Sequence, residues 1–288
     1  MSRFDERRVA VQIGETEISF TTGKLAKQAG GSVLVQAGDT VVLATATAGG
    51  ERDIDFLPLT VDVEERMYAT GKIPGSFFKR EGRSGEKATL VCRMIDRPLR
   101  PLFPNGWHRD TQIVATPLSI DHINPYDVLA MNGASAALMI SDIPFDTPVG
   151  AVRIGLVEGN FVVNPAEESL LTEGESDLDL VVAGTEHAIL MVEAGANEVT
   201  EAEILDALDI AHGEIKKLCA AQHELRELKG KEKTQVNPPQ LDEALFAEIE
   251  GSHGHAMREA VTIPEKLVRY AKIDEIKAAI KAQYGPAG

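Results

Sequence analysis

Two predicted β-hairpins near the N-terminus limit the folds that this chain can adopt. The first covers 9–20, where apolar and polar residues alternate on both sides of the turn Gly14-Glu15. The second covers 32–47 and turns at Gly38-Asp39. A further alternating segment at 57–63 predicts another strand, so the first sixty residues are expected to be rich in β-structure.

The middle of the chain mixes helical and strand-like patterns. A helix is predicted over 86–95 and is expected to end near Asp96, because Pro98 pushes the residue before it out of the α region. Thr200 and Glu203 have the spacing of a capping box, followed by apolar residues at steps of three and four. The other predicted elements are a strand at 112–118, a helix at 126–141, a hairpin over 150–163, and strands at 178–183 and 188–193.

The last part of the chain has a different pattern. A polar segment at 229–240, which contains Pro238-Pro239, is predicted to be a linker, and only helices are predicted over 241–284. The predicted fold class is therefore α+β, followed by an all-α domain. The predicted domains are 1–146 and 147–228, as two parts of one core, and then 229–288.

The chain carries no signal for a membrane or for secretion. No run approaches 18 apolar residues, and the first residues lead into a strand rather than an apolar signal core. Its two cysteines, Cys92 and Cys219, lie far apart and fit no metal spacing, so each is predicted to be a small buried hydrophobe. A reduced, cytoplasmic protein without membrane contact is the simplest interpretation.

Charge is distributed very unevenly along the chain. The net charge of −16 argues against nucleic acid as a partner, because phosphates repel an acidic surface. From Arg66 to Arg109, however, ten basic residues face three acidic ones, so this segment carries +7 and the rest carries −23. The basic segment is therefore predicted to meet an anion.

A loop at 75–83 concentrates these basic residues beside two aromatic ones. Phe77 and Phe78 cannot easily both reach a core from such a polar loop, and aromatic faces stack on unpaired bases while Lys and Arg hold phosphates. The alternative is a loop with one Phe anchored in the core and a solvated charged face. The residues predicted to bind RNA here are Phe77, Phe78, Lys79, Arg80 and Arg83.

Three further arginines, Arg93, Arg97 and Arg100, extend the basic segment. Arg93 and Arg97 are four residues apart and share a helix face, so an anion there would relieve their repulsion. They are predicted to contact RNA backbone or phosphate. The alternative is pairing with neighbouring acids such as Asp96 or Glu86.

Other polar groups are weaker candidates for catalysis or for metal and phosphate binding. Six carboxylates between 167 and 179 could hold Mg²⁺, but acidic runs are usually solvated surface. Ser135, within 132–135, could meet a phosphate, although packing is favoured. The histidines have no metal-ligand spacing, and no nucleotide-binding glycine motif is present. No catalytic or metal-ligating residue is therefore assigned in this chain.

Four segments resemble the first half of bacterial polynucleotide phosphorylases, also called polyribonucleotide nucleotidyltransferases. They are PLTVDVEER at 58–66, ATGKIPGSFFKREGR at 69–83, IDRPLRPLF at 95–103 and LVVAGT at 180–185. The resemblance extends from about Arg8 into the predicted helical domain. It implies an RNase PH-like core, with the ribosomal protein S5 domain 2-like β/α fold, followed by a helical domain.

This resemblance also implies a function for the whole protein. Its members degrade mRNA from the 3′ end, use inorganic phosphate as co-substrate and Mg²⁺ as cofactor, and release nucleoside diphosphates. Three subunits form a ring that joins RNA-degrading assemblies, and the double-aromatic loop grips single-stranded RNA at the ring's channel. The phosphorolytic site and its Mg²⁺ are expected in a second core.

The first core is expected to be inactive. Active cores of this family carry a glycine followed by phosphate-binding serines, whereas only Ser135 remains in the matching GASA at 133–136. Active cores also carry a lysine after a metal-binding Asp. Here Asp179 is present and a further Asp is matched by Glu173, but Val181 replaces the lysine. Losing the serines and the lysine removes phosphate capture and transition-state stabilisation.

This chain is therefore expected to bind and thread RNA and to assemble the ring without degrading RNA itself. Two alternatives remain open at this point: a non-catalytic ring scaffold, and a regulatory core that binds a nucleotide such as a guanine nucleotide. The chain is also expected to be part of a longer protein, because the family's helical domain runs further.

Overall fold

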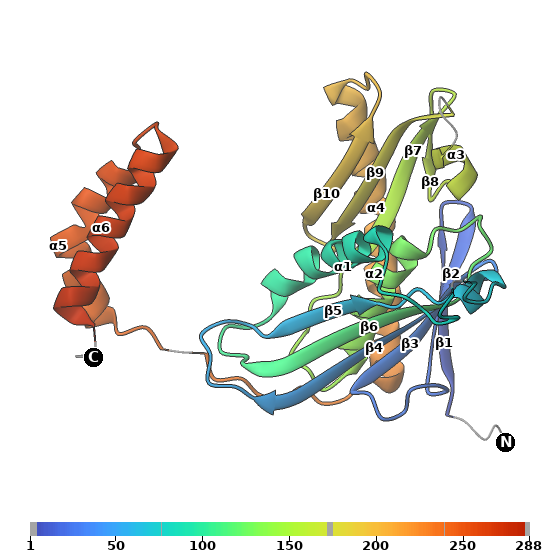
Figure 1. Ribbon diagram of the computed structural model, residues 1–288, viewed down its shortest axis with the longest axis horizontal. Coiled ribbons are helices and arrows are strands. Elements are labelled where there is room, and N and C mark those ends of the chain that lie inside the picture. The colour runs from blue at the N-terminus through green and yellow to red at the C-terminus, as the bar shows by residue number, and fades with distance from the viewer. Residues whose placement is uncertain (1–4, 76, 172–174, 239, 286–288) are drawn as a thin grey trace. The chain divides into compact units, whose positions relative to one another are not determined.

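The computed structural model describes residues 5–75, 77–171, 175–238 and 240–285. The chain divides into two compact units, Met1–Asn237 and Pro238–Gly288, and each is described by itself. The first unit contains two sheets and the helices that pack on them (Figure 1).

The larger sheet of the first unit has six strands in the order β1-β2-β3-β4-β6-β5. Neighbouring strands are antiparallel except β5, which runs parallel to β6. The two predicted hairpins are both present, with Val9 opposite Phe20 and Val33 opposite Ala44. The strands are β1 (Arg7–Ile13), β2 (Thr16–Thr22), β3 (Gly31–Ala37), β4 (Thr40–Glu51), β5 (Leu59–Val63) and β6 (Arg109–Ser119).

The smaller sheet has four antiparallel strands in the order β10-β9-β7-β8. Its central strands are almost fully buried, whereas most of β10 is exposed at the sheet edge. The strands are β7 (Gly150–Val157), β8 (Asn160–Val163), β9 (Ser176–Gly184) and β10 (Ile189–Ala196). A short helix, α3 (Glu167–Leu171), lies between β8 and β9 and was not predicted.

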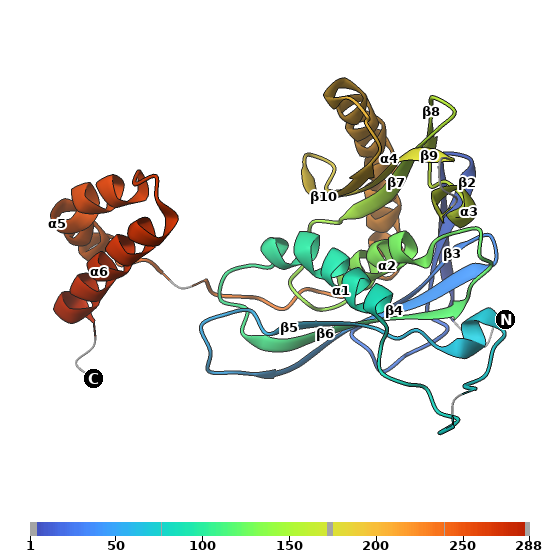
Figure 2. The same cartoon turned by 45° about the horizontal axis from the view of Figure 1, so that its top comes forward.

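One helix forms the centre of the core. Every residue of α2 (Tyr126–Ile140) is buried, because the helix contacts β3 and β4 as well as β7 and α4 (Glu201–Lys229). Gly133 permits this close approach, since a Cβ there would meet Ala44 Cβ at 2.9 Å. The helix α1 (Glu86–Leu99) and α2 cover the same side of the larger sheet (Figure 2).

The predicted end of α1 near Asp96 is wrong, because the helix continues through Pro98 to Leu99. Pro98 and Leu99 are both buried, so packing outweighs the local preference of the residue before proline. The backbone N–H of Arg100 then donates to Asp96 O, and a short 3₁₀ helix, η2 (Arg100–Leu102), follows.

The polar segment after α4 was predicted to be a linker, and hydrogen bonds attach it to the rest of the first unit. The backbone N–H groups of Lys231 and Thr234 donate to Ile140 O at 3.0 Å and Asp142 O at 2.8 Å. Lys233 Nζ lies within 2.8–3.0 Å of the carbonyl oxygens at the C-terminus of α2, namely those of Leu138, Met139 and Ser141. We call residues 230–236 the strap.

The second unit consists of two helices, α5 (Glu243–Val261) and α6 (Lys266–Tyr284). Asp242 caps α5 by accepting a hydrogen bond from Leu245 N at 3.0 Å. The two helices contact each other, and Ala260 and Ile276 are their buried residues within the described range. Among the described residues, no helix of either unit is long and apolar enough to span a bilayer.

Candidate nucleic-acid interface

The basic aromatic loop connects a 3₁₀ helix, η1 (Met67–Thr70), to α1. Phe77 is 95% exposed and Phe78 is 77% exposed, so neither ring reaches the core. The two rings contact each other edge to face, with centroids 5.5 Å apart and an interplanar angle of 84°. Two aromatic faces are thus held together in solvent, and the alternative of a core-anchored Phe does not apply.

The cations of this loop are available to a ligand. Lys79, Arg80 and Arg83 are exposed and form no ion pair with any residue that the structure describes. Lys79 has a positive φ of 47°, so the chain turns sharply directly after the two phenylalanines. The segment projects away from the body of the first unit (Figure 2).

One acidic residue of the loop, Glu81, faces inward. Its Oε1 accepts a hydrogen bond from the backbone N–H of Met67 at 3.0 Å, which ties the loop to η1. This residue was not singled out in the sequence, where it is one acid among several bases. No local pattern signals the contact, because its partner lies fourteen residues earlier in the chain.

The three further arginines, two on α1 and one at the start of η2, differ in their surroundings. Arg93 is exposed and forms no ion pair within the described part of the chain. Arg97 pairs with Glu193 of β10, with about half of each side chain exposed. Arg100 is half-buried and engaged by the protein: it contacts both carboxylate oxygens of Asp96 at 2.6 and 2.9 Å and donates to Leu57 O and Leu59 O.

A cavity of about 420 Å³ lies between α1 and the smaller sheet, beside these arginines. At its base Arg153 donates to Asp127 at 2.8 Å, and its Nε lies 3.3 Å from Asp179 Oδ1. The second contact is an ion pair by distance but lacks hydrogen-bond alignment, so both atoms are buried without a hydrogen-bond partner among the described residues. Arg153 thus lies between two carboxylates, Asp127 and Asp179, and forms its aligned hydrogen bond with Asp127.

The acidic cluster at 167–179 does not gather around one point. Glu167 pairs with Lys87 at 2.8 Å, and Asp177 faces Asn197 at 3.3 Å. Glu173 lies outside the described residues. Over the described ranges, no group of three or more His, Cys, Asp and Glu side chains could hold a metal ion.

Ser135 is part of the core, which supports the packing interpretation of its motif. Its side chain is fully buried; the hydroxyl donates to Gln222 Oε1 at 2.7 Å and accepts from Val149 N at 2.8 Å. Gln222 Nε2 in turn donates to Val149 O at 2.8 Å. Val181, at the position of the family's lysine, is buried as well. None of these groups can receive a phosphate from solvent.

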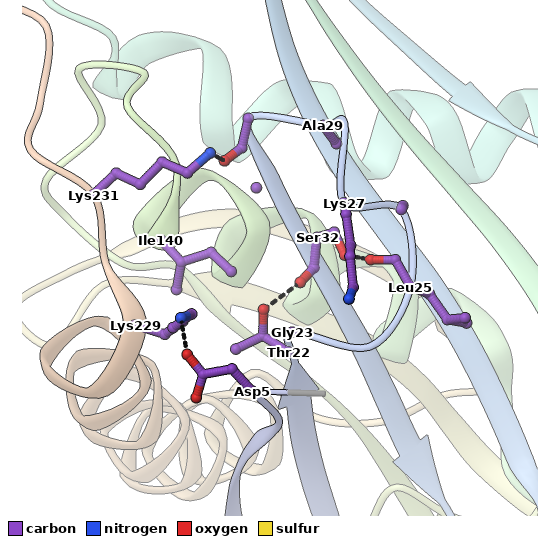
Figure 3. Close-up of a pocket in the computed structure, with 13 residues that line it drawn as sticks. Asp5, Thr22, Gly23, Leu25, Lys27, Ala29, Ser32, Ile140, Lys229 and Lys231 are labelled. Carbon is purple, nitrogen blue, oxygen red and sulfur yellow. Dashed lines mark hydrogen bonds and ion pairs between the residues drawn. The ribbon is translucent and has the colours of Figure 1, made fainter. Parts of the chain in front are cut away.

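A second cavity, of about 260 Å³, lies where the strap meets the β2–β3 loop (Figure 3). Lys229 faces Asp5 across one side, and Lys231 Nζ donates to Gly30 O at 2.6 Å on the other. Thr22 and Ser32 are bonded to the backbone within the cavity wall. Lys231 fastens the strap here and Lys229 ties the end of α4 to Asp5, and no residue of the basic loop lines this cavity.

Comparison with known proteins places both parts of the first unit in one family. Residues 15–144 match a family model described as 3′ exoribonuclease family, domain 1, and residues 147–214 match domain 2 of the same family. Among solved structures, the chain is similar to the crystal structure of rice Rrp46, with a TM-score of 0.56 and 15% identity over 74% of this chain and 96% of that one. That likeness establishes the fold, an RNase PH-like α+β core.

Curated relatives agree with this assignment. The chain is 53% identical over 268 residues to a polyribonucleotide nucleotidyltransferase of Halothermothrix orenii, and 50% identical over 281 residues to one of Geobacillus kaustophilus. The matches cover 93% and 97% of this chain but 38% of each relative.

Proposed function

This chain belongs to the 3′ exoribonuclease family, and from this premise we propose that it is the first RNase PH-like core of a polyribonucleotide nucleotidyltransferase. The complete protein would attack the 3′ end of RNA with inorganic phosphate and release nucleoside diphosphates. Identities near 50% to relatives of that name support the proposal.

Within such an enzyme, the basic loop is the part that grips single-stranded RNA. The observation that carries this proposal is the pair Phe77 and Phe78, exposed side by side and followed by cations without partners among the described residues. An apolar pair in water is costly unless a ligand covers it, and a base has an apolar face of matching size. Lys79, Arg80 and Arg83 are placed to neutralise the phosphates on either side.

The arginines of α1 and η2 contribute to this grip in different ways. Arg93 is free to meet a phosphate. The Arg97–Glu193 pair is half exposed, and such pairs stabilise a protein by only about 0–1 kcal/mol, so a phosphate can replace Glu193 at little cost. Arg100 holds the chain at Leu57 and Leu59 next to α1, and its part in RNA binding is to position this region.

The first core does not carry out phosphorolysis. Ser135 is buried in the core, Val181 carries no charge, and Asp179 lies 3.3 Å from the guanidinium of Arg153. These residues do not fit a Mg²⁺ ion or a phosphate group. We propose that both bind in a second core of the complete protein. The curated relatives have room for such a core, because they are more than twice as long as this chain.

The remaining parts serve assembly. We assign residues 1–146 and 147–228 to one core and the helices of 238–288 to an all-α domain, with the strap between them. A homotrimeric ring in the cytoplasm, joined to other RNA-degrading proteins, fits the family and the two free cysteines. In this arrangement the projecting loop lines the path of the RNA.

The experiment that tests the grip is fluorescence anisotropy of this chain with a labelled oligo(A). Because stacking contributes about 1–3 kcal/mol per base, the double change Phe77→Ala and Phe78→Ala is expected to weaken binding at least about ten-fold. Phe56→Ala removes another phenylalanine of the same unit, 62% exposed but outside the loop, and serves as the control. Equal affinity of the double variant and the wild type would overturn the proposal.

A further inference from the structure

Among its described residues, the loop that carries Phe77 and Phe78 is attached near its middle by Glu81. From Gly75 to Glu86, every described residue is exposed except Glu81, which is half-buried. Glu81 is also the one acid between Lys72 and Gly85. A carboxylate beside groups that bind phosphate opposes the electrostatic attraction of RNA, so its position calls for a physical reason.

The contact that Glu81 makes provides that reason. Its Oε1 accepts from the N–H of Met67, the first residue of η1, at 3.0 Å. N–H groups in the first turn of a helix have no partner within the helix, and Arg66, the residue before η1, makes no side-chain cap. A carboxylate at this end satisfies the donor and lies at the favourable end of the helix dipole.

The helix η1 is itself fixed to the core. Ala69 is buried, and its carbonyl oxygen accepts from Ile120 N, just after β6, at 2.9 Å. Gly71 ends the helix in the left-handed region, and Lys72 N donates to Met67 O at 3.0 Å. The hydrogen bond to Glu81 therefore connects the exposed loop to the rigid sheet.

This connection shortens the part of the chain that must be ordered when RNA binds. Without it, the chain between Lys72 and the start of α1 at Glu86 is a long span whose described residues are mostly exposed, and fixing such a span costs conformational entropy. With it, the span is closed near its middle, and Phe77 to Arg80 form a short preformed tip. Preorganisation of this kind raises affinity by reducing the entropy lost on binding.

We propose that Glu81 is a positioning residue for RNA binding: its hydrogen bond to Met67 N holds the aromatic and basic tip in the arrangement that single-stranded RNA meets. This inference rests on the proposed RNA grip. The two roles that Glu81 could have differ in sign. As a mere negative charge it weakens binding, and its removal strengthens binding; as an anchor it strengthens binding, and its removal weakens binding.

Two substitutions separate the charge from the anchor. Glu81→Gln removes the charge but retains an oxygen that accepts from Met67 N, and affinity for labelled oligo(A) is expected to stay the same or rise up to about three-fold. Glu81→Ala removes both and is expected to weaken binding about five-fold, the size of one lost hydrogen bond. Glu86→Gln, an exposed acid at the start of α1, reports the effect of charge alone and is expected to follow Glu81→Gln.

Two further readouts distinguish positioning from a general loss of structure. The salt dependence of binding is expected to be unchanged in Glu81→Ala, because every cation remains, and the melting temperature is expected to move little. Hydrogen exchange at the Met67 amide is expected to become faster in Glu81→Ala and to remain slow in Glu81→Gln. Glu81→Ala binding as tightly as Glu81→Gln would overturn the proposal, as would unchanged exchange at Met67.

These outcomes are distinct from a failure of the RNA grip itself. If the wild-type chain does not bind oligo(A), or if Phe77→Ala and Phe78→Ala have no effect, the proposed function fails whatever Glu81 does. If those variants weaken binding and Glu81→Ala does not, only the anchor is wrong.

Discussion

The hydroxyl of Ser135 donates a 2.7 Å hydrogen bond to Oε1 of Gln222, and both side chains are fully buried. The bond joins α2 to α4, and through Val149 N it also includes the start of β7. A serine that the family pattern associates with phosphate is thus used to hold three elements together. This buried, structural use of Ser135 supports the proposal that this core does not carry out the reaction.

Changing Ser135 to Ala is therefore expected to affect stability and not RNA binding. The change leaves Gln222 Oε1 and Val149 N buried without this partner, at a cost of about 1–3 kcal/mol. Urea denaturation measures the loss, and anisotropy with oligo(A) is expected to be unaltered. A variant as stable as the wild type but weaker in phosphate or RNA binding would contradict the structural role.

The isolated chain is expected to release no nucleoside diphosphate from poly(A) when phosphate and Mg²⁺ are supplied. A full-length relative of the same family is the positive control for the assay. Removal of divalent ions with a chelator is also expected to leave the melting temperature of the chain unchanged, because the described carboxylates at 167–179 form no group that could hold a metal ion. Chelator-sensitive product formation would show that the first core is active after all.

Local features of this fold follow from the sequence more readily than distant contacts. The hairpins depend on alternation and turns, and the capping box of Thr200 and Glu203 was predicted and is present in full. The end of α1 was mispredicted, because burial of Pro98 and Leu99 depends on residues far along the chain.

In the candidate site, too, features that depend on neighbouring residues were predictable, and contacts between distant residues were not. The exposure of Phe77 and Phe78 follows from a polar loop that offers no route to the core. Three contacts join residues that are not neighbours in sequence: Arg100 to Leu57 O, Arg153 to Asp179, and Glu81 to Met67 N. A pattern of residue types carries no signal for such pairs.

The basic residues are expected to differ in how they change the salt dependence of RNA binding. Substituting Ala for Arg80 or Arg83 would remove one of the proposed phosphate contacts, so the slope of log affinity against log salt should fall by about 0.7 for each. Arg100→Ala should leave the slope unchanged and lower stability instead, because its guanidinium binds Asp96 and two backbone carbonyls. Anisotropy titrations at several salt concentrations measure the slopes. Equal slopes for all three variants would contradict this division.

The two thiols are expected to react at very different rates. Burial raises the pKa of Cys219 to about 12, and it also raises the pKa of the half-buried Cys92. At pH 8 a thiol reagent should modify Cys92 slowly and Cys219 only after unfolding, since the thiolate is the reacting form. In the folded protein Cys219 keeps its proton above the ordinary thiol range, so its contribution to stability should decline as pH rises from about 9 towards 12. Mass spectrometry after alkylation identifies the modified residue.

The strap is expected to depend on Lys233, whose ammonium donates to three carbonyl oxygens at the end of α2. Lys233→Met keeps the length of the side chain and removes these bonds, so the amides of Lys231 and Thr234, which bond to Ile140 O and Asp142 O, should exchange at least about ten times faster. Lys216→Met, an exposed lysine of α4, is the control. Unchanged exchange at both amides would show that the strap is held by its backbone alone.

The pH dependence of stability provides an independent check on Lys233. Burial lowers its pKa to about 8, below the 10.5 of an ordinary lysine, so between these values the unfolded chain binds the proton more often than the folded protein does. Stability rises with pH wherever the unfolded state binds more protons. The free energy of unfolding of the wild type, relative to Lys233→Met, should therefore increase from pH 8 to pH 10, whereas below pH 8 the difference should be constant. A difference that falls over this window would mean that the three carbonyls outweigh burial and raise the pKa of the ammonium instead.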